Sequence, residues 1–196
     1  MKGTVMKAIA INGSARAGGN TEILLERCLA VLADNGISGE LTRLSDKTIL
    51  PCRACGACFK NKDNRCSMQD DAFQKLYDAM READIILLGS PVYFGSATAN
   101  LTALLDRAGY VARANGNVFS RKIGGPVVVA RRAGQNFTLA QIMFWFMIMD
   151  MVVPGSTYWT MGIGREAGEV GEDTEAIATI THFAENLAWL AKKLQG

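Results

Sequence analysis

Short apolar runs alternate along the chain with longer segments in which apolar residues recur every three or four positions. The runs have the length and composition of β-strands, and the segments between them have the spacing of amphipathic helices. The predicted strands are residues 5–11, 38–44, 85–89, 125–130 and 151–153. The predicted helices are one through Leu24, Cys28 and Leu32 up to Asn35, then helices at about 70–82, 97–109, 141–149 and 172–194.

The order of these elements predicts an α/β fold. The runs at 85–89 and 125–130 contain no charged residue, as expected for strands covered on both faces. Strands that alternate with helices pair in parallel through right-handed crossovers. We therefore expect a five-stranded parallel sheet with helices on both faces. A ligand is expected beyond the carboxyl ends of the strands, at the loops after strands one, three and four.

Length and charge limit the classes of protein to which this chain can belong. A chain of 196 residues favours a single domain over residues 1–196. The 21 basic and 19 acidic residues are interspersed, without the concentrated basic face that nucleic-acid binding requires. The apolar run near the N-terminus is too short for a signal-peptide core or a membrane span, and so is segment 142–149. We therefore expect a cytoplasmic protein that binds neither nucleic acid nor membrane.

The loop after the first strand, from Gly13 to Thr21, is rich in glycine and in hydrogen-bond donors. It runs directly into a helix, whose N-terminal amides and dipole favour an anion. Ser14, Asn20 and Thr21 can donate hydrogen bonds, and Arg16 adds positive charge. The spacing matches neither the dinucleotide fingerprint nor the nucleotide triphosphatase loop, so a monophosphate such as that of FMN fits better. The alternative is a glycine-rich turn in which Asn20 or Thr21 only caps the helix.

The loop after the third strand carries two aromatic residues, Tyr93 and Phe94, at the same edge of the sheet. A flat heteroaromatic ring needs apolar faces to stack on and backbone groups to meet its polar rim, and this loop supplies both. Alternatively, the two aromatic side chains only cover the core.

Together, the loops resemble the NADPH-dependent FMN reductase family. The matching motifs are Gly13-Ser14-x-Arg16-x-Gly18-Gly19-Asn20-Thr21, Ser90-Pro91-Val92-Tyr93-Phe94-Gly95-Ser96 and Arg132-x-Gly134-Gln135. They occur in the right order and span nearly the whole chain. The resemblance implies a flavodoxin-like three-layer fold that binds FMN, with NAD(P)H as co-substrate.

The resemblance also assigns the FMN contacts. In that family the first loop holds the FMN phosphate, the second lies against the isoalloxazine, and the third contacts its pyrimidine edge. Two departures, Ala15 where a proline is common and Asn136 where an acidic residue is common, remove none of the expected donors. Carried over, the contacts fall on Ser14, Arg16, Gly19, Asn20 and Thr21, on Pro91, Val92, Tyr93, Phe94 and Gly95, and on Arg132, Ala133 and Gly134.

Four of the five cysteines lie in one long loop at about residues 45–69. Cys52, Cys55 and Cys58 are separated by two residues each, and Cys66 follows after seven more. In a cytosolic chain this spacing indicates metal or redox chemistry rather than disulfides. It resembles the compact ligand motif of the iron-sulfur flavoproteins, a branch of the same superfamily, which implies a [4Fe–4S] cluster on these thiolates. A tetrahedral zinc site, free thiols and a purely structural loop are the alternatives.

Three further features have simpler interpretations. Cys28 lies at helical spacing among apolar residues and is predicted to be buried, and His182, the only histidine, is predicted to be structural. Segment 142–149 is apolar on every side, so one face would be exposed in a monomer, and we expect a homodimer or homotetramer. Tyr158 and Trp159 either approach a flavin from this side or belong to the interface or core.

The predicted function is that of an oxidoreductase in which NAD(P)H delivers hydride to bound FMN, which passes electrons to a small-molecule or protein acceptor. The flavin carries the chemistry, so no catalytic side chain is predicted. The rival is a ferredoxin-linked iron-sulfur flavoprotein that transfers electrons without significant NAD(P)H oxidation. A third class is a metal-binding or flavin-storing protein without turnover.

Overall fold

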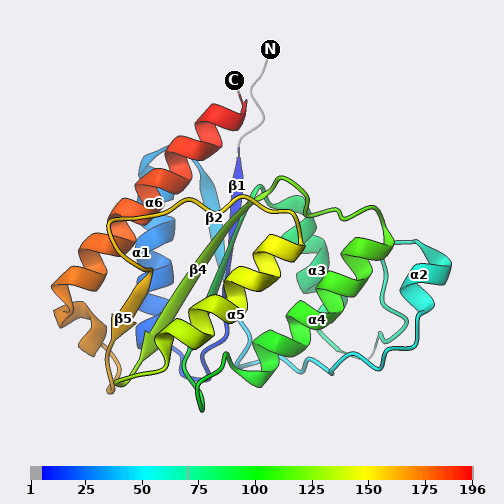
Figure 1. The fold of residues 1–196 in the computed structure, drawn as a ribbon, viewed down its shortest axis with the longest axis horizontal. Coiled ribbons are helices and arrows are strands. Elements are labelled where there is room, and N and C mark those ends of the chain that lie inside the picture. Colours follow the sequence, from blue (N-terminus) through cyan, green and yellow to red (C-terminus); the bar gives the residue numbers. More distant parts are fainter. Residues whose placement is uncertain (1–5, 70, 196) are drawn as a thin grey trace.

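The computed structural model describes residues 6–69 and 71–195. Five parallel strands form one sheet in the order β2-β1-β3-β4-β5 (Figure 1). The strands are β1 (Lys7–Asn12), β2 (Ser38–Arg43), β3 (Ile85–Pro91), β4 (Ile123–Ala130) and β5 (Met161–Ile163). The helices are α1 (Asn20–Asp34), α2 (Ala57–Asn61), α3 (Phe73–Glu82), α4 (Ala99–Ala114), α5 (Gln135–Ile148) and α6 (Thr174–Gln195), with a 3-10 turn η1 (Glu169–Glu172) before α6.

Helices cover both faces of the sheet and bury an apolar cluster on each side. Leu87 and Val127 pack toward α1 and α6, whereas their neighbours Ile86 and Val128 pack toward α3, α4 and α5. Successive residues of a strand point to opposite faces, so a strand buried on both sides is apolar throughout. The predicted five-stranded parallel sheet with helices on both faces is confirmed.

Several element boundaries differ from those predicted. The predicted start of the first strand at Val5 and that of the second predicted helix at Asp70 lie outside the described residues. Helix α4 continues beyond its predicted end to Ala114, and α5 begins at Gln135, before its apolar segment. The short helix α2, inside the cysteine-bearing loop, was not predicted, and it packs beside α4 (Figure 1).

The fifth strand was predicted in the wrong place. Residues 151–153 do not form a strand, and Val152 makes only an isolated bridge to Ile123 at the start of β4. The strand that completes the sheet is β5, where Met161 pairs with Val128. Between Val152 and β5, residues 153–159 lie outside the sheet and form no strand.

Two prolines explain this interruption. The next step of the parallel ladder would need the N–H of residue 154 to donate to Gly124 O and the N–H of residue 126 to donate back, yet both residues are proline. Proline has no N–H, so both ladder bonds are missing. Pairing resumes only where Val128 N donates to Thr160 O at 3.0 Å.

None of the helices in the described part of the chain is long and apolar enough to cross a membrane.

Candidate functional site

The loops after β1, β3 and β4 meet at the carboxyl edge of the sheet, on the lower side of Figure 1. Gly13 N donates to Gly89 O at 2.8 Å, and the Thr98 hydroxyl donates to Gly13 O at 2.9 Å. A Cβ on Gly13 would lie 2.9 Å from Thr98 Oγ1 and 3.0 Å from Gly89 O, so only glycine fits there. The first and second predicted loops are therefore in direct contact.

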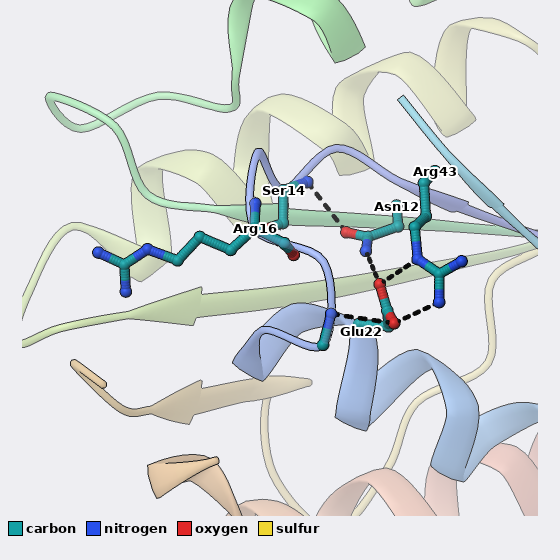
Figure 2. Close-up of polar contacts among 6 residues, drawn as sticks. Asn12, Ser14, Arg16, Glu22 and Arg43 are labelled. Atoms are coloured by element: carbon teal, nitrogen blue, oxygen red, sulfur yellow. Dashed lines mark hydrogen bonds and ion pairs between the residues drawn. The ribbon is translucent and has the colours of Figure 1, made fainter. Parts of the chain in front are cut away.

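Polar side chains shape the turn between β1 and α1. Asn12 Oδ1 accepts a hydrogen bond from Ser14 N at 2.9 Å, as Figure 2 shows, and Ser14 Oγ accepts one from Arg16 N at 3.1 Å. Gly18 adopts a left-handed φ of 64°, and a Cβ on Gly19 would lie 3.1 Å from the Arg16 backbone oxygen. The chain thus turns tightly before it enters α1.

Several donors of this turn point to no protein acceptor. The backbone N–H groups of Ala15, Ala17, Asn20 and Thr21 donate to no acceptor in residues 6–69 and 71–195, and no side chain caps the N-terminus of α1. Thr21, in the first turn of α1, is a buried residue. Unpaired amides at a helix N-terminus bind an anion well. These residues therefore fit the phosphate of FMN.

The carboxylate of Glu22 holds the turn through hydrogen bonds, a role not predicted from the sequence. Glu22 is buried and accepts hydrogen bonds from Asn12 Nδ2 at 3.0 Å and from Gly18 N at 3.2 Å (Figure 2). Arg43, at the end of β2, donates to it from Nε at 2.8 Å and from Nη2 at 2.6 Å. The hydrogen bonds and charge of Arg43 hold the pKa of the Glu22 carboxyl below its usual value. An acidic residue in the first turn of a helix beside an anion site is the signal that could have identified it.

The structure gives the side chain of Asn20 a different role from the one expected. Its amide nitrogen donates to Glu166 O at 2.8 Å, and its Oδ1 accepts from Gly168 N at 2.9 Å and from Val170 N at 3.3 Å. The side chain therefore ties α1 to the loop after β5, and only its backbone N–H faces an incoming anion unpaired. Arg16 also extends to this loop, where it donates to the Arg165 carbonyl at 2.9 Å.

The second loop is a tight hairpin turn. Tyr93 N donates to Ser96 O at 2.9 Å and Ser96 N donates back at 3.1 Å, while Phe94 and Gly95 take positive φ values of 53° and 81°. Phe94 is fully exposed and Tyr93 is 44% exposed. Phe94 therefore does not cover the core, and the loop presents aromatic surface to the solvent at this edge.

The third loop lies against the second. Gly134, with a φ of 93°, immediately precedes α5, and a Cβ on it would lie 2.9 Å from Val92 Cγ1 and 3.5 Å from Gly95 Cα. The preceding residues, Arg132 and Ala133, are exposed. The three predicted loops thus form one continuous surface, with polar donors at α1 and apolar and aromatic groups toward α5.

The four clustered cysteines line one cavity of about 180 Å³ beside α4. The Ala54 amide donates to the Cys52 sulfur at 3.4 Å, and the Ser67 hydroxyl lies 3.3 Å from the Cys55 sulfur. The hydrogen bond with Ser67 lowers the pKa of the Cys55 thiol, which favours the thiolate that metals bind. The other cavity walls include Cys58, Cys66, Arg107 and Tyr110.

A buried arginine connects both ends of the cysteine loop to α4. Arg107 donates from Nη1 to Leu50 O at 3.1 Å and from Nη2 to Met68 O at 3.0 Å, and it forms an ion pair with Asp71. Its guanidinium lies 4.0 Å from the centre of the Phe73 ring. These contacts bring the segments beside the first and last cysteines of the motif to α4.

The spacing of the thiols bears on the kind of metal. Among the described residues, no three cysteine, histidine or acidic side chains are close enough to hold a single ion. Tetrahedral zinc needs sulfur atoms about 2.3 Å from the metal, and hence about 3.8 Å from one another. A four-iron cluster binds each thiolate at a different iron, so its ligands stand further apart. The four cysteines line one cavity of about 180 Å³, but no three of them meet closely enough for a single ion, so the site suits a cluster better than one ion.

Comparison with known proteins agrees with this arrangement. The chain is 35% identical to an iron-sulfur flavoprotein of Methanocaldococcus jannaschii, over 97% of this chain and 100% of that protein. It is 33% identical to an iron-sulfur flavoprotein of Methanosarcina thermophila, over 97% of each chain. Among solved structures, it superposes on a flavodoxin, WrbA-like protein from Agrobacterium tumefaciens with a TM-score of 0.66 and 12% identity, over 97% of this chain and 99% of that one.

The flavodoxin-like fold is thereby confirmed, and the matches support an FMN-binding oxidoreductase. The family model described as NADPH-dependent FMN reductase matches residues 6–166, which include all three loops. The chain therefore belongs to the NADPH-dependent FMN reductase family.

Proposed function

We propose that this protein is an FMN-dependent NAD(P)H oxidoreductase that also carries a [4Fe–4S] cluster. The observation that carries the proposal is the meeting of three loops around unpaired amides at the N-terminus of α1. Bound FMN would supply the chemistry, because a flavin accepts a hydride and releases electrons one at a time.

The role of the protein is then to bind and orient. The amides of residues 15, 17, 20 and 21 and the Thr21 hydroxyl hold the phosphate, and Arg16 adds charge at the open side. The hairpin at Tyr93 and Phe94 offers a face to the isoalloxazine, and the exposed backbone at Arg132 and Ala133 offers donors to its pyrimidine edge. No side-chain acid or base is required.

The cysteine cavity would hold the cluster through Cys52, Cys55, Cys58 and Cys66. Such a cluster exchanges one electron at a time, which suits it to pass electrons between a flavin and a protein partner. The donor set supports this role, because thiolates are the usual ligands of iron-sulfur clusters.

The second candidate is a ferredoxin-linked electron carrier without significant NAD(P)H oxidation. Both relatives compared above bear the name iron-sulfur flavoprotein, which is compatible with such a carrier. The site described above is compatible with both candidates, because the same residues would hold FMN and the cluster in each.

Anaerobic stopped-flow mixing with NADPH, NADH or reduced ferredoxin separates the candidates. A nicotinamide oxidoreductase bleaches the flavin rapidly with NADPH or NADH. Rapid reduction by ferredoxin alone would overturn the first candidate in favour of the second. Reduction by none of the three would leave a metal-binding or flavin-storing protein without turnover.

A further inference from the structure

Arg107 stands out because its charge is buried and it belongs to none of the three flavin loops. Its side chain is 1% exposed, in the middle of α4, and its partner Asp71 is fully buried. Burial of an ion pair costs free energy that a pair of apolar residues would not cost. A role beyond packing therefore has to be sought in what the guanidinium contacts.

The terminal nitrogens of Arg107 are accounted for by the loop. Nη1 and Nη2 bind the carbonyls of Leu50 and Met68 and the Asp71 carboxylate. Asp71 in turn accepts hydrogen bonds from Leu50 N at 2.8 Å and from Phe73 N at 3.3 Å. This network is a structural clamp that closes the cysteine loop.

The clamp does not account for Nε of Arg107. This N–H donor is buried and has no hydrogen-bond partner among the described residues. Only three buried side-chain polar atoms in that part of the chain, Nε included, lack a partner. An unpaired buried donor is costly, so native proteins rarely leave one without an acceptor. Arg107 also lines the cavity shared by the four cysteines. A group bound in that cavity is therefore a candidate acceptor for Nε.

We propose that Arg107 tunes the group held by the four cysteines, by donating its Nε–H to a cysteine thiolate or cluster sulfide. The inference rests on the proposed cluster and extends it to a residue outside the cysteine motif. A hydrogen bond to cluster sulfur stabilises the more negative, reduced form and so raises the reduction potential. Arg107 is thus a positioning residue for the loop and an electrostatic partner of the cluster.

The two residues of the ion pair have opposite effects on the reduction potential of the cluster. The Arg107 cation favours the reduced cluster, whereas the Asp71 anion, held beside it, disfavours it. A purely structural clamp predicts no such difference, because the loss of either partner would loosen the loop in the same way. The sign of the potential shift therefore separates tuning from packing.

The test uses full-length protein purified without oxygen, with iron and sulfide analysis and a spectroelectrochemical titration of cluster and flavin. The variants are Arg107→Lys, Arg107→Gln and Asp71→Asn. Arg113→Gln is the matched control, because Arg113 is exposed on the same helix. We expect the cluster potential to move negative in both Arg107 variants and positive in Asp71→Asn. The FMN potential and the control should stay at the wild-type value.

A double variant, Arg107→Gln with Asp71→Asn, guards against loss of folding, since it leaves no unpaired buried charge. Its cluster potential should lie below that of Asp71→Asn alone. Equal potentials in those two proteins, or shifts of the same sign in Arg107→Gln and Asp71→Asn, would overturn the tuning role and leave the cluster in place. Wild-type protein without iron under these conditions would overturn the cluster and the tuning role together.

Discussion

Glu22 and Arg43 form a two-point ion pair between α1 and β2, with Nε and Nη2 of the arginine 2.8 Å and 2.6 Å from the two carboxylate oxygens. The same carboxylate binds Asn12 and Gly18, at the two ends of the turn between β1 and α1 (Figure 2). An anionic carboxylate near a phosphate site would repel the ligand, but here Arg43 balances its charge. The pair therefore fixes the shape of the turn without opposing an anion.

Glu22→Gln should lower stability and FMN affinity together. We expect a loss of about 1–3 kcal/mol of unfolding free energy at neutral pH, typical of hydrogen bonds to a charged group. Urea unfolding measures it, with Glu26→Gln, exposed on the same helix, as the control. Because the folded state holds the Glu22 pKa below 4.5, this stabilisation is full above that pH and is lost as the pH falls through the lowered pKa. The difference between wild type and variant should therefore shrink in acid, and an equal difference at all pH values would contradict the assignment.

The loop from Gly13 to Thr21 should contribute most of the FMN affinity. Arg16→Ala combined with Thr21→Ala should weaken FMN binding by about 2–5 kcal/mol, from the lost hydrogen bonds and charge. Equilibrium dialysis measures the change. Arg27→Ala with Thr181→Ala is a matched control, because these residues form an Arg–Thr hydrogen bond on the surface of α1 and α6. Unchanged FMN affinity in the loop variant would show that this turn does not bind the phosphate.

Gly134→Ala should disturb the contact between the second and third loops. An L-residue is strained at a φ of 93°, and its Cβ would press against Val92 at 2.9 Å. We expect a loss of roughly 1–3 kcal/mol in stability and weaker FMN binding. Gly155→Ala should have little effect, since no atom lies within 4 Å of the added Cβ and the glycine has no positive φ. Thermal unfolding and FMN titration of both variants test this.

The outer face of α5 should form a subunit interface. Ile142 and Phe146 are buried against the sheet, whereas Phe144, Met147 and Ile148 are 68%, 66% and 59% exposed. An exposed apolar row of this kind favours a dimer interface that buries at least ~1,000 Å². Light scattering at micromolar concentration should give a dimer or tetramer mass, and Phe144→Glu with Met147→Glu should give a monomer. Trp189→Glu, an exposed aromatic on α6, is the control, and a monomeric wild type would contradict the prediction.

Protein purified without oxygen should contain about four iron and four sulfide per chain, as one cubane cluster requires. Cys55→Ser should lose most of the iron and retain FMN. Cys28→Ala is the control, because Cys28 lies in the α1 core and burial raises its thiol pKa to about 12. Stoichiometric zinc, or no metal at all, would contradict the cluster and leave an FMN reductase whose cysteine loop has another purpose.

The apolar runs at β1, β3 and β4 were readable from the sequence because a strand buried on both faces admits few other residues. The order of strands and helices then dictated parallel pairing, and with it the edge at which the three loops meet. Local chemistry was sufficient for these features, since each depends on residues close together in the chain.

The position of the fifth strand depended on tertiary structure. Residues 151–153 have the composition of a strand, but their pairing depends on what β4 offers, and Pro126 and Pro154 remove the two bonds that would extend it. A single-segment pattern does not contain that information, because the two prolines meet only after the chain has folded.

The same distinction holds within the sites. The sequence identified the glycine-rich turn and the cysteine spacing, because both are local motifs. Only the folded chain brought Arg43 to Glu22, Gly168 to Asn20 and Arg107 to the cysteine loop, over separations of 21, 148 and about 40 residues. A hydrogen bond between residues that are distant in the sequence leaves no local sequence pattern. Such partners are therefore identified only from the tertiary structure.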